Sequence, residues 1–312
     1  MSTFRNEEVA RLTEFATERY GVSTHILPFH LIDYVLHDSV RATAVDYFHR
    51  HGIKWWTGPL DAGRSERKDN EPAQPTGYLT SSQVACVNHL EPARLDRGLA
   101  AAVLAGLDQR LVEPLAVDAG YAAYEWIGAE NYLGEPGTRT RGANVTSLDA
   151  LMRARRDDGA IVVVAIEWKY TENPDPRQKL TSDRGTDRVA VYRALLERPG
   201  CPIRRGSPER LFYEPYYQLM RQTLLAWQMH EHGELDADDW IHIQVVPTEN
   251  TSVRGRTGAA PELPGETAEE AWRSALVQPE RFRQLTPSEL LAGVGTTGPA
   301  GWRDWLRERY LT

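Results

Sequence analysis

Three charged residues in the middle of the sequence have types and spacing that suit metal-assisted hydrolysis. Two of them, Glu167 and Lys169, lie at the end of the apolar run 161–170, IVVVAIEWKY, which is typical of a buried strand. Side chains alternate between the two faces of a strand, so Glu167 and Lys169 share one face. The other face carries Ile166, Trp168 and Tyr170. A carboxylate and an ammonium are therefore expected side by side at the end of a core strand.

The third residue, Asp149, lies in the preceding strand pattern, LDALMRAR of residues 148–155. The Asp-Asp-Gly sequence that follows this pattern is a hairpin turn signal. If the hairpin centres on Asp158, Asp149 lies opposite Glu167. Directly opposed residues of an antiparallel pair share a face, with Cβ atoms ~4.5–5.5 Å apart. A slip of one residue would turn Asp149 to the other face.

Two carboxylates this close repel each other unless a cation neutralises them. Mg²⁺ prefers oxygen ligands and completes its shell with water and substrate phosphate, and Mn²⁺ can substitute for it. We expect Asp149, Glu167 and the backbone carbonyl of Trp168 to hold such an ion, which would polarise a phosphodiester. Lys169 would then orient or help deprotonate the attacking water, or stabilise charge on the phosphoryl oxygens.

The segments around these residues carry a resemblance to a known family. The TSLD of 146–149 and the EWK of 167–169, joined by a hairpin, resemble the PD-(D/E)XK nuclease superfamily of restriction endonucleases, over about residues 115–250. Leu148 stands where the family's first motif has proline. The resemblance implies an α/β fold with a mixed central sheet flanked by helices in αβββαβ order. It also implies that Asp149 and Glu167 are metal ligands and that Lys169 is the catalytic lysine.

The order of the predicted elements agrees with that core. Strands are expected near 121–128, 148–155, 161–170 and 240–247, and helices near 186–197 and 214–231. We therefore divide the chain into a mainly helical N-terminal region, 1–115, a nuclease core, 116–250, and a C-terminal helical extension, 251–312. Helices are predicted at 6–19, 31–51, 96–111, 266–276 and 299–310. A further helix is predicted to begin after a cap at Ser81 or Ser82. Residues 57–77, rich in Pro, Gly and charge, predict a long loop.

Accessory residues are assigned by position. Among Glu125, Glu130 and Glu135, we favour Glu135 as a further metal ligand, with an ordinary surface glutamate as the alternative. Gln218 lies on a polar stripe of the helix 214–231 with Arg221 and Gln222, and could reach the active site or a phosphate. A solvated helix face is the other interpretation of that stripe.

Candidate nucleic-acid contacts are Arg139 and Arg141, in a glycine-containing loop before the Asp149 strand, and Arg221. Simple surface exposure is the alternative for each of them. The Trp168 ring is expected to pack on the opposite face of its strand rather than to stack on a base.

Composition sets the broad class. Of 312 residues, 41% are hydrophobic and 26% charged, and no stretch approaches the ~18–20 apolar residues of a membrane span. The N-terminus lacks a signal-peptide pattern, so we expect a cytoplasmic protein with no membrane contact. Two cysteines are too few for a disulfide framework. The net charge is −8, but residues 139–205 carry +5, which leaves a basic segment in an acidic protein.

The sequence thus favours a Mg²⁺-dependent endodeoxyribonuclease of restriction or defence type, acting on double-stranded DNA, as a homodimer or with a partner subunit. A retaining glycosidase also uses two close carboxylates, but Lys169 and the basic segment argue against it. The second alternative is a nuclease-like subunit that binds nucleic acid or assembles with other proteins without cutting. The recognition sequence, DNA against RNA, and endo against exo action are left open.

Overall fold

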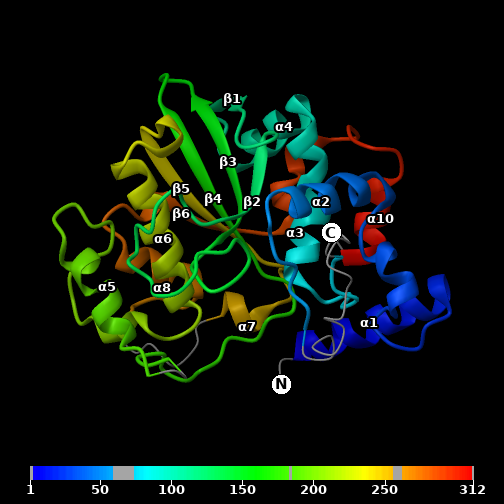
Figure 1. Ribbon diagram of the computed structural model, residues 1–312, viewed down its shortest axis with the longest axis horizontal. Helices are drawn as coiled ribbons and strands as arrows, with labels where there is room; N and C mark the ends of the chain where they lie inside the picture. Colours follow the sequence, from blue (N-terminus) through cyan, green and yellow to red (C-terminus); the bar gives the residue numbers. More distant parts are fainter. Residues whose placement is uncertain (1–2, 59–73, 183–184, 256–261, 311–312) are drawn as a thin grey trace.

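A mixed six-stranded sheet forms the centre of the computed structural model, which describes residues 3–58, 74–182, 185–255 and 262–310. Helices cover both faces of the sheet (Figure 1). One apolar cluster joins α1–α4 and α10 to one face, and a second joins α5, α6 and α8 to the other. The predicted α/β class, a mixed sheet flanked by helices, is therefore confirmed.

The strands run β1 (Leu111–Leu115), β2 (Ala122–Trp126), β3 (Leu148–Arg156), β4 (Ile161–Trp168), β5 (Asp239–Val245) and β6 (Phe282–Leu285). Their order is β1-β3-β4-β5-β6, with β2 also paired to β3. β3 is antiparallel to β1, β2 and β4, whereas β4, β5 and β6 are parallel to one another. β4 is thus a central strand, as its apolar sequence predicts.

The helices are α1 (Thr3–Tyr20), α2 (Asp38–Arg50), α3 (Ser82–Leu95), α4 (Arg97–Leu107), α5 (Arg188–Glu197), α6 (Tyr216–Glu231), α7 (Thr251–Arg254), α8 (Ala268–Ala275), α9 (Pro287–Leu290) and α10 (Trp302–Tyr310). The predicted helix 31–51 is divided into a 3-10 helix, Phe29–Val35, and α2, which is capped by His37. Ser81 caps α3 by accepting a hydrogen bond from the Val84 N–H, which agrees with one of the two predicted starts.

Two strands were not predicted from the sequence. β1 follows α4 directly, where a longer helix was expected, and β6 lies in the predicted C-terminal helical extension. Both are short edge strands, of five and four residues, with weak alternation. The sheet therefore draws strands from outside 116–250, and the three-part division of the chain stays a prediction. Of the predicted loop 57–77, residues 59–73 lie outside the described residues.

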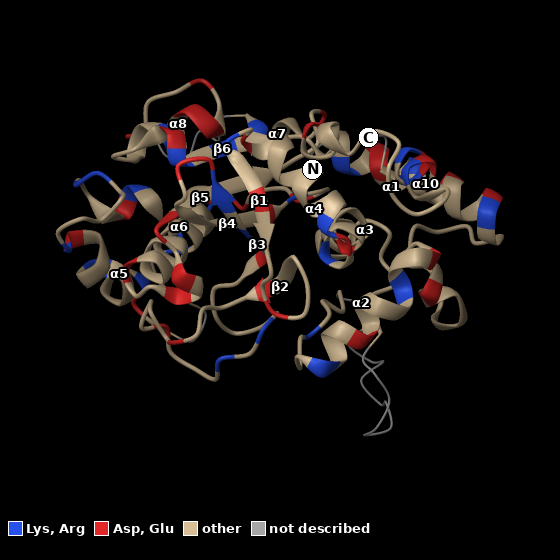
Figure 2. Ribbon diagram, turned by 90° about the horizontal axis from the view of Figure 1, so that it is seen from above, with Lys and Arg blue, Asp and Glu red and all other residues tan. Residues whose placement is uncertain are grey.

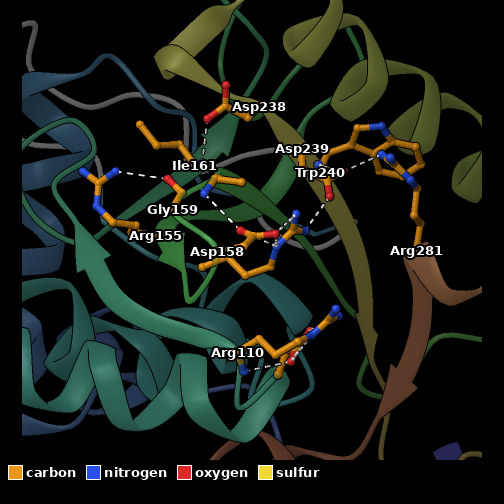
Figure 3. Close-up of polar contacts among 12 residues, drawn as sticks. Arg110, Arg155, Asp158, Gly159, Ile161, Asp238, Asp239, Trp240 and Arg281 are labelled. Atoms are coloured by element: carbon orange, nitrogen blue, oxygen red, sulfur yellow. Dashed lines mark hydrogen bonds and ion pairs between the residues drawn. The ribbon is translucent and has the colours of Figure 1, made fainter.

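The β3–β4 register is the one predicted. Ala150 pairs with Ile166 and Arg155 with Ile161, so the hairpin is centred on Asp158. At the turn, Asp158 accepts hydrogen bonds from Arg156 at 2.9–3.0 Å, and Arg156 also donates to Asp239 of β5 at 2.7 Å. Arg281 contacts the same Asp239 at 2.8 Å, beside the Trp240 ring (Figure 3). These contacts hold the register at the end of the hairpin remote from Asp149.

Two histidines are buried in this fold. His242 of β5 is 0% exposed, with its Nδ1 at 2.9 Å from the Thr223 hydroxyl, and burial lowers the pKa of His242 to about 3. His89 of α3 is also buried, which lowers its pKa to about 4. Because the folded state binds these protons less readily than the unfolded state, each histidine contributes stability above pH ~6.5 that is lost as the pH falls.

We therefore expect the free energy of unfolding to fall between pH 6.5 and 4, by about 1.4 kcal/mol per pH unit for each histidine. His242→Gln should reduce this slope in denaturant titrations at several pH values. The control is His49→Gln, an exposed position on α2. Equal slopes for wild type and His242→Gln would contradict the assignment of acid lability to His242.

Candidate active site

One cavity of about 370 Å³ joins the predicted catalytic residues. The sheet and α6 contribute Glu125, Asp149, Glu167, Lys169 and Gln218 to its lining. The N-terminal region contributes Arg5, Trp56 and the residues from Thr80 to Gln83. Two other cavities, of about 390 and 420 Å³, are larger, but neither is lined by more than one carboxylate. Chemistry rather than size therefore selects this cavity.

Glu167 lies at the centre of a hydrogen-bond network. It is 0% exposed, and its Oε1 lies 2.6 Å from the Lys169 Nζ. The Gln218 side chain donates to the same oxygen at 2.5 Å, and the Gln222 side chain donates to Oε2. Both glutamines come from α6, which packs on the face of β4 that carries Glu167. Each oxygen of this buried carboxylate thus has at least one hydrogen-bond donor.

Asp149 is joined to the same site through the hairpin. Its Oδ2 accepts a hydrogen bond of 2.6 Å from the Trp168 backbone N–H, one residue beyond Glu167. Burial, followed by the charges of Glu167 and Glu125, raises the pKa of Asp149 well above its ordinary value, although Lys169 and the Trp168 N–H act in the opposite direction. The predicted convergence of Asp149, Glu167 and Lys169 therefore holds in three dimensions.

Glu125 is the third carboxylate of the cavity. It lies between Tyr124 and Trp126, which pair with β3, and has a positive φ of 49°, a conformation that costs energy for a residue with a side chain. Its oxygens accept hydrogen bonds of 2.7 Å from Ser147 and Gln83. Burial raises the pKa of Glu125, these two hydrogen bonds lower it, and the charge of Glu167 raises it further. Strained backbone thus directs a buried acid into the cavity.

Lys169 keeps its proton in this environment. Burial by itself lowers its pKa, but the charges of Glu167, Glu172 and Asp149 outweigh that effect and raise the pKa above its ordinary value. Its side chain is 14% exposed, so the ammonium can still be reached from the cavity. A cation is therefore held beside the carboxylates of this cavity.

The family model described as Restriction Endonuclease associating with ARP matches residues 23–311, nearly the whole chain. The chain belongs to this family. Comparisons with curated proteins and with solved structures gave no match.

Membership of the REase-ARP family supports a restriction-endonuclease-like protein with a nuclease-like function, and it favours that reading over the glycosidase alternative. The family description also implies association with another protein, ARP. No helix in the described part of the chain combines the length and apolar composition needed to cross a membrane. Cytoplasmic location stays a prediction.

The carboxylates of Glu125, Asp149 and Glu167 in this REase-ARP cavity suit a hard cation, whereas Trp168 is not among the residues that line it. Within the described residues, no three carboxylate, imidazole or thiol groups are arranged to hold a metal ion. The oxygens of Glu167 face Lys169 and the two glutamines. Mg²⁺ commonly uses only one or two protein carboxylates with water, so the number of carboxylates in this cavity would be enough for such an ion.

Glu135, the accessory ligand favoured from the sequence, lies in another cavity. Its carboxylate accepts hydrogen bonds from the Thr146 N–H and hydroxyl and, at 2.6 Å, from the Tyr192 hydroxyl. Glu125, another of the three glutamates considered, lies in the active-site cavity instead. Gln218 reaches the active-site cavity and Glu167, and its role there stays a prediction. The Trp168 ring packs 4.6 Å from the His89 ring, as expected.

The three candidate nucleic-acid contacts bind protein groups in this structure. Arg139 donates to the carbonyls of Ile127, Gly128 and Ala129, and Arg141 to Asp118, the Tyr47 hydroxyl and the Tyr124 carbonyl. Arg221 donates to the Thr146 hydroxyl at 3.2 Å and lies in the cavity of Glu135. Arg139 and Arg141 therefore brace the loop before β3, and any phosphate contact would be additional.

The basic segment 139–205 includes β3, β4 and α5. Figure 2 shows basic and acidic residues interspersed along the ribbon. Arg153 pairs with Asp236, Arg155 with Glu113 and Arg177 with Asp175. Arg153 and Arg155 are thus neutralised by acidic residues outside the segment.

The residues of the site that sequence reasoning missed include Gln83, Ser147 and Trp56. Gln83 and Ser147 hold Glu125 from either side, and Trp56 lines the cavity. Ser147 was within the quoted TSLD motif, so its place was available from the sequence. Gln83 is 42 residues from Glu125, and no local pattern signals that contact.

Proposed function

We propose that this chain is a metal-dependent nuclease of the PD-(D/E)XK type, a DNA endonuclease of restriction or defence type. The observation that carries the proposal is the convergence of Asp149, Glu167 and Lys169 in one cavity, at the end of the β3–β4 hairpin. Membership of a restriction endonuclease family supports the same chemistry. The second candidate function is that of a nuclease-like subunit that does not cut nucleic acid.

Asp149 and Glu167, with the Trp168 carbonyl, would hold Mg²⁺, and Glu125 would contribute further negative charge. The ion, when bound, supplies Lewis-acid polarisation of the phosphodiester. The protein's part is positioning: the Trp168 N–H orients Asp149, and Gln218 and Gln222 orient Glu167. Such fixed geometry lowers the cost of reaching the transition state.

Lys169 acts as a cation in this mechanism. Because its pKa is raised, it carries a proton at neutral pH and donates hydrogen bonds to the attacking water or to the phosphoryl oxygens. Of the three roles considered from the sequence for Lys169, charge stabilisation and water orientation are favoured over proton abstraction. A general base must be deprotonated before it can accept a proton, so its pKa should lie near the working pH.

The direct test is cleavage by the purified chain. Plasmid, linear duplex, single-stranded DNA and RNA are incubated with the protein in Mg²⁺, Mn²⁺ or EDTA. The Lys169→Met variant, purified in parallel, shows how much cleavage comes from a contaminating nuclease. We expect cleavage of DNA that needs the metal and is lost in the variant. Cleavage that persists in EDTA, or equally in the variant, would refute the proposed mechanism.

Two observations favour the non-cutting alternative: the family description implies association with ARP, and the Glu167 oxygens are already matched by protein donors. Calorimetry with Mg²⁺ and Mn²⁺ separates the two functions. A metal-dependent nuclease should bind the ion at millimolar concentration, and Asp149→Asn should lose that binding. A folded protein with no metal binding and no cleavage of any substrate would support the assembly subunit.

A further inference from the structure

Trp56 is an exposed aromatic residue in the active-site cavity. It is 48% exposed, whereas its neighbour Trp55 is 5% exposed and stacks on Phe48 with ring centroids 3.7 Å apart. Trp56 lines the same cavity as Asp149, Glu167 and Lys169. The segment thus buries one tryptophan as an anchor and leaves the next one facing the place where chemistry is proposed.

Gln83 ties this segment to the carboxylates. The Trp56 backbone N–H donates to the Gln83 Oε1 at 2.8 Å. The Gln83 Nε2 donates to the Lys54 carbonyl at 3.2 Å and to Glu125 at 2.7 Å. The Trp56 ring also lies edge-on to Tyr78, with centroids 5.3 Å apart at 64°. The indole is therefore held at a set position relative to the acids, as a binding platform requires.

Packing alone does not explain this arrangement, because a ring that served only the core would be buried like Trp55. A planar apolar face suits stacking on a nucleobase, which is tolerant of sequence because every base has a π-face. The same cavity is lined by the guanidinium-bearing Arg5 of α1. An aromatic face and a cation beside hydrolytic carboxylates match the base, the phosphate and the scissile bond of a nucleotide.

We propose that Trp56 stacks on an unpaired base next to the scissile phosphate, so that the preferred substrate is a single strand or a locally opened duplex. This inference rests on the proposed nuclease function. A paired base is stacked on its neighbours within the duplex and offers no free face, so the platform selects strands in which that base has left the stack.

Binding in EDTA, where metal-dependent hydrolysis does not occur, tests the proposal. Fluorescence anisotropy would compare a single strand, a fully paired duplex and a duplex with a central mismatch bubble, for wild type, Trp56→Phe and Trp56→Leu. We expect Trp56→Leu to weaken binding of the single strand and the bubble by about 5- to 140-fold, the range of one base–aromatic stack. Trp56→Phe should keep most of the affinity, and the paired duplex should change little.

The matched control is Phe29→Leu, which removes a 58% exposed aromatic ring outside this cavity. A second readout is the fluorescence of 2-aminopurine placed at successive positions of the strand. Stacking on an aromatic ring quenches this fluorescence. One position should be quenched by wild type and Trp56→Phe but not by Trp56→Leu.

The outcomes separate the two proposals. Equal affinity and equal quenching in wild type and Trp56→Leu, with cleavage intact, would overturn the stacking role and leave the nuclease in place. A wild-type protein that neither binds nor cuts any strand would remove the nuclease function, and the stacking role with it. A thermal unfolding midpoint matching wild type shows that Trp56→Leu is folded.

Discussion

Lys169→Met is expected to lower metal-dependent cleavage by about 10²- to 10⁴-fold, the range for losing a positioned charge or proton-transfer group. It should also lower the free energy of unfolding by about 2–3 kcal/mol, because it leaves a buried carboxylate without its cation. Glu167 is 0% exposed and its Oε1 lies 2.6 Å from the Lys169 ammonium. Gln218 and Gln222 still donate to Glu167, which keeps the loss below that of an isolated buried charge.

Single-turnover cleavage and urea unfolding measure the two effects. The matched control is Lys179→Met, which removes a lysine–aspartate pair of 2.5 Å outside the cavity. Adding Glu167→Gln to Lys169→Met removes both charges and should restore most of the stability but none of the activity. If Lys169→Met cut DNA at the wild-type rate, the catalytic assignment of Lys169 would be wrong.

Asp149→Asn should lower cleavage about as strongly as Lys169→Met does. Unlike Lys169→Met, it should raise the free energy of unfolding. Its carboxylate is held near Glu125 and Glu167, and burial together with those charges raises its pKa. The amide keeps an oxygen to accept the Trp168 N–H and removes the repulsion. In EDTA at neutral pH we expect Asp149→Asn to be more stable than wild type, by an amount of the order of 1 kcal/mol.

The sign of the pH dependence follows from the raised pKa. The folded state holds the Asp149 proton more tightly than the unfolded chain, whose Asp pKa is ~3.9. The resulting stabilisation of the wild type is complete below that value and is lost as the pH rises through the folded pKa. The stability gap between Asp149→Asn and wild type should therefore close toward pH 4.

Mg²⁺ gives an independent check on the same variant. An ion that binds only the folded state raises its thermal midpoint. Saturating Mg²⁺ should raise the midpoint of the wild type and leave that of Asp149→Asn unchanged. An equal rise in both proteins would place the ion elsewhere, and a stability loss in Asp149→Asn would contradict the proposed repulsion.

Much of the site could be predicted because its determinants are local. The alternation of β4 separates Glu167 from Ile166 and Trp168, and the symmetry of a hairpin centred on Asp158 sets Asp149 opposite Glu167. The helix carrying Gln218 and Gln222 was predicted from its periodicity, and it packs its polar stripe onto Glu167. These relations span one strand, one turn or one helix, where residue spacing and side-chain direction are coupled.

The edges of the sheet and the accessory groups were not predictable in this way. β1 and β6 are short strands whose sequences carry little alternation, and only pairing with longer strands defines them. The choice of Glu125 over Glu135 depends on a positive φ at Glu125 and on hydrogen bonds from Ser147 and Gln83. A single residue's strained conformation is stabilised by its surroundings, so it leaves no periodic signal in the sequence.

The sequence by itself determined the α/β class, the central hairpin and the shared face of Asp149, Glu167 and Lys169. Only the tertiary structure decided that Glu125 joins them, that Glu135 and Arg221 belong to another cavity, and that Trp56 reaches the site from the N-terminal region. The physical reason is the range of the interactions. Strand alternation and hairpin register act over neighbouring residues, whereas the contacts of Gln83 and Trp56 exist only once distant segments pack against the sheet.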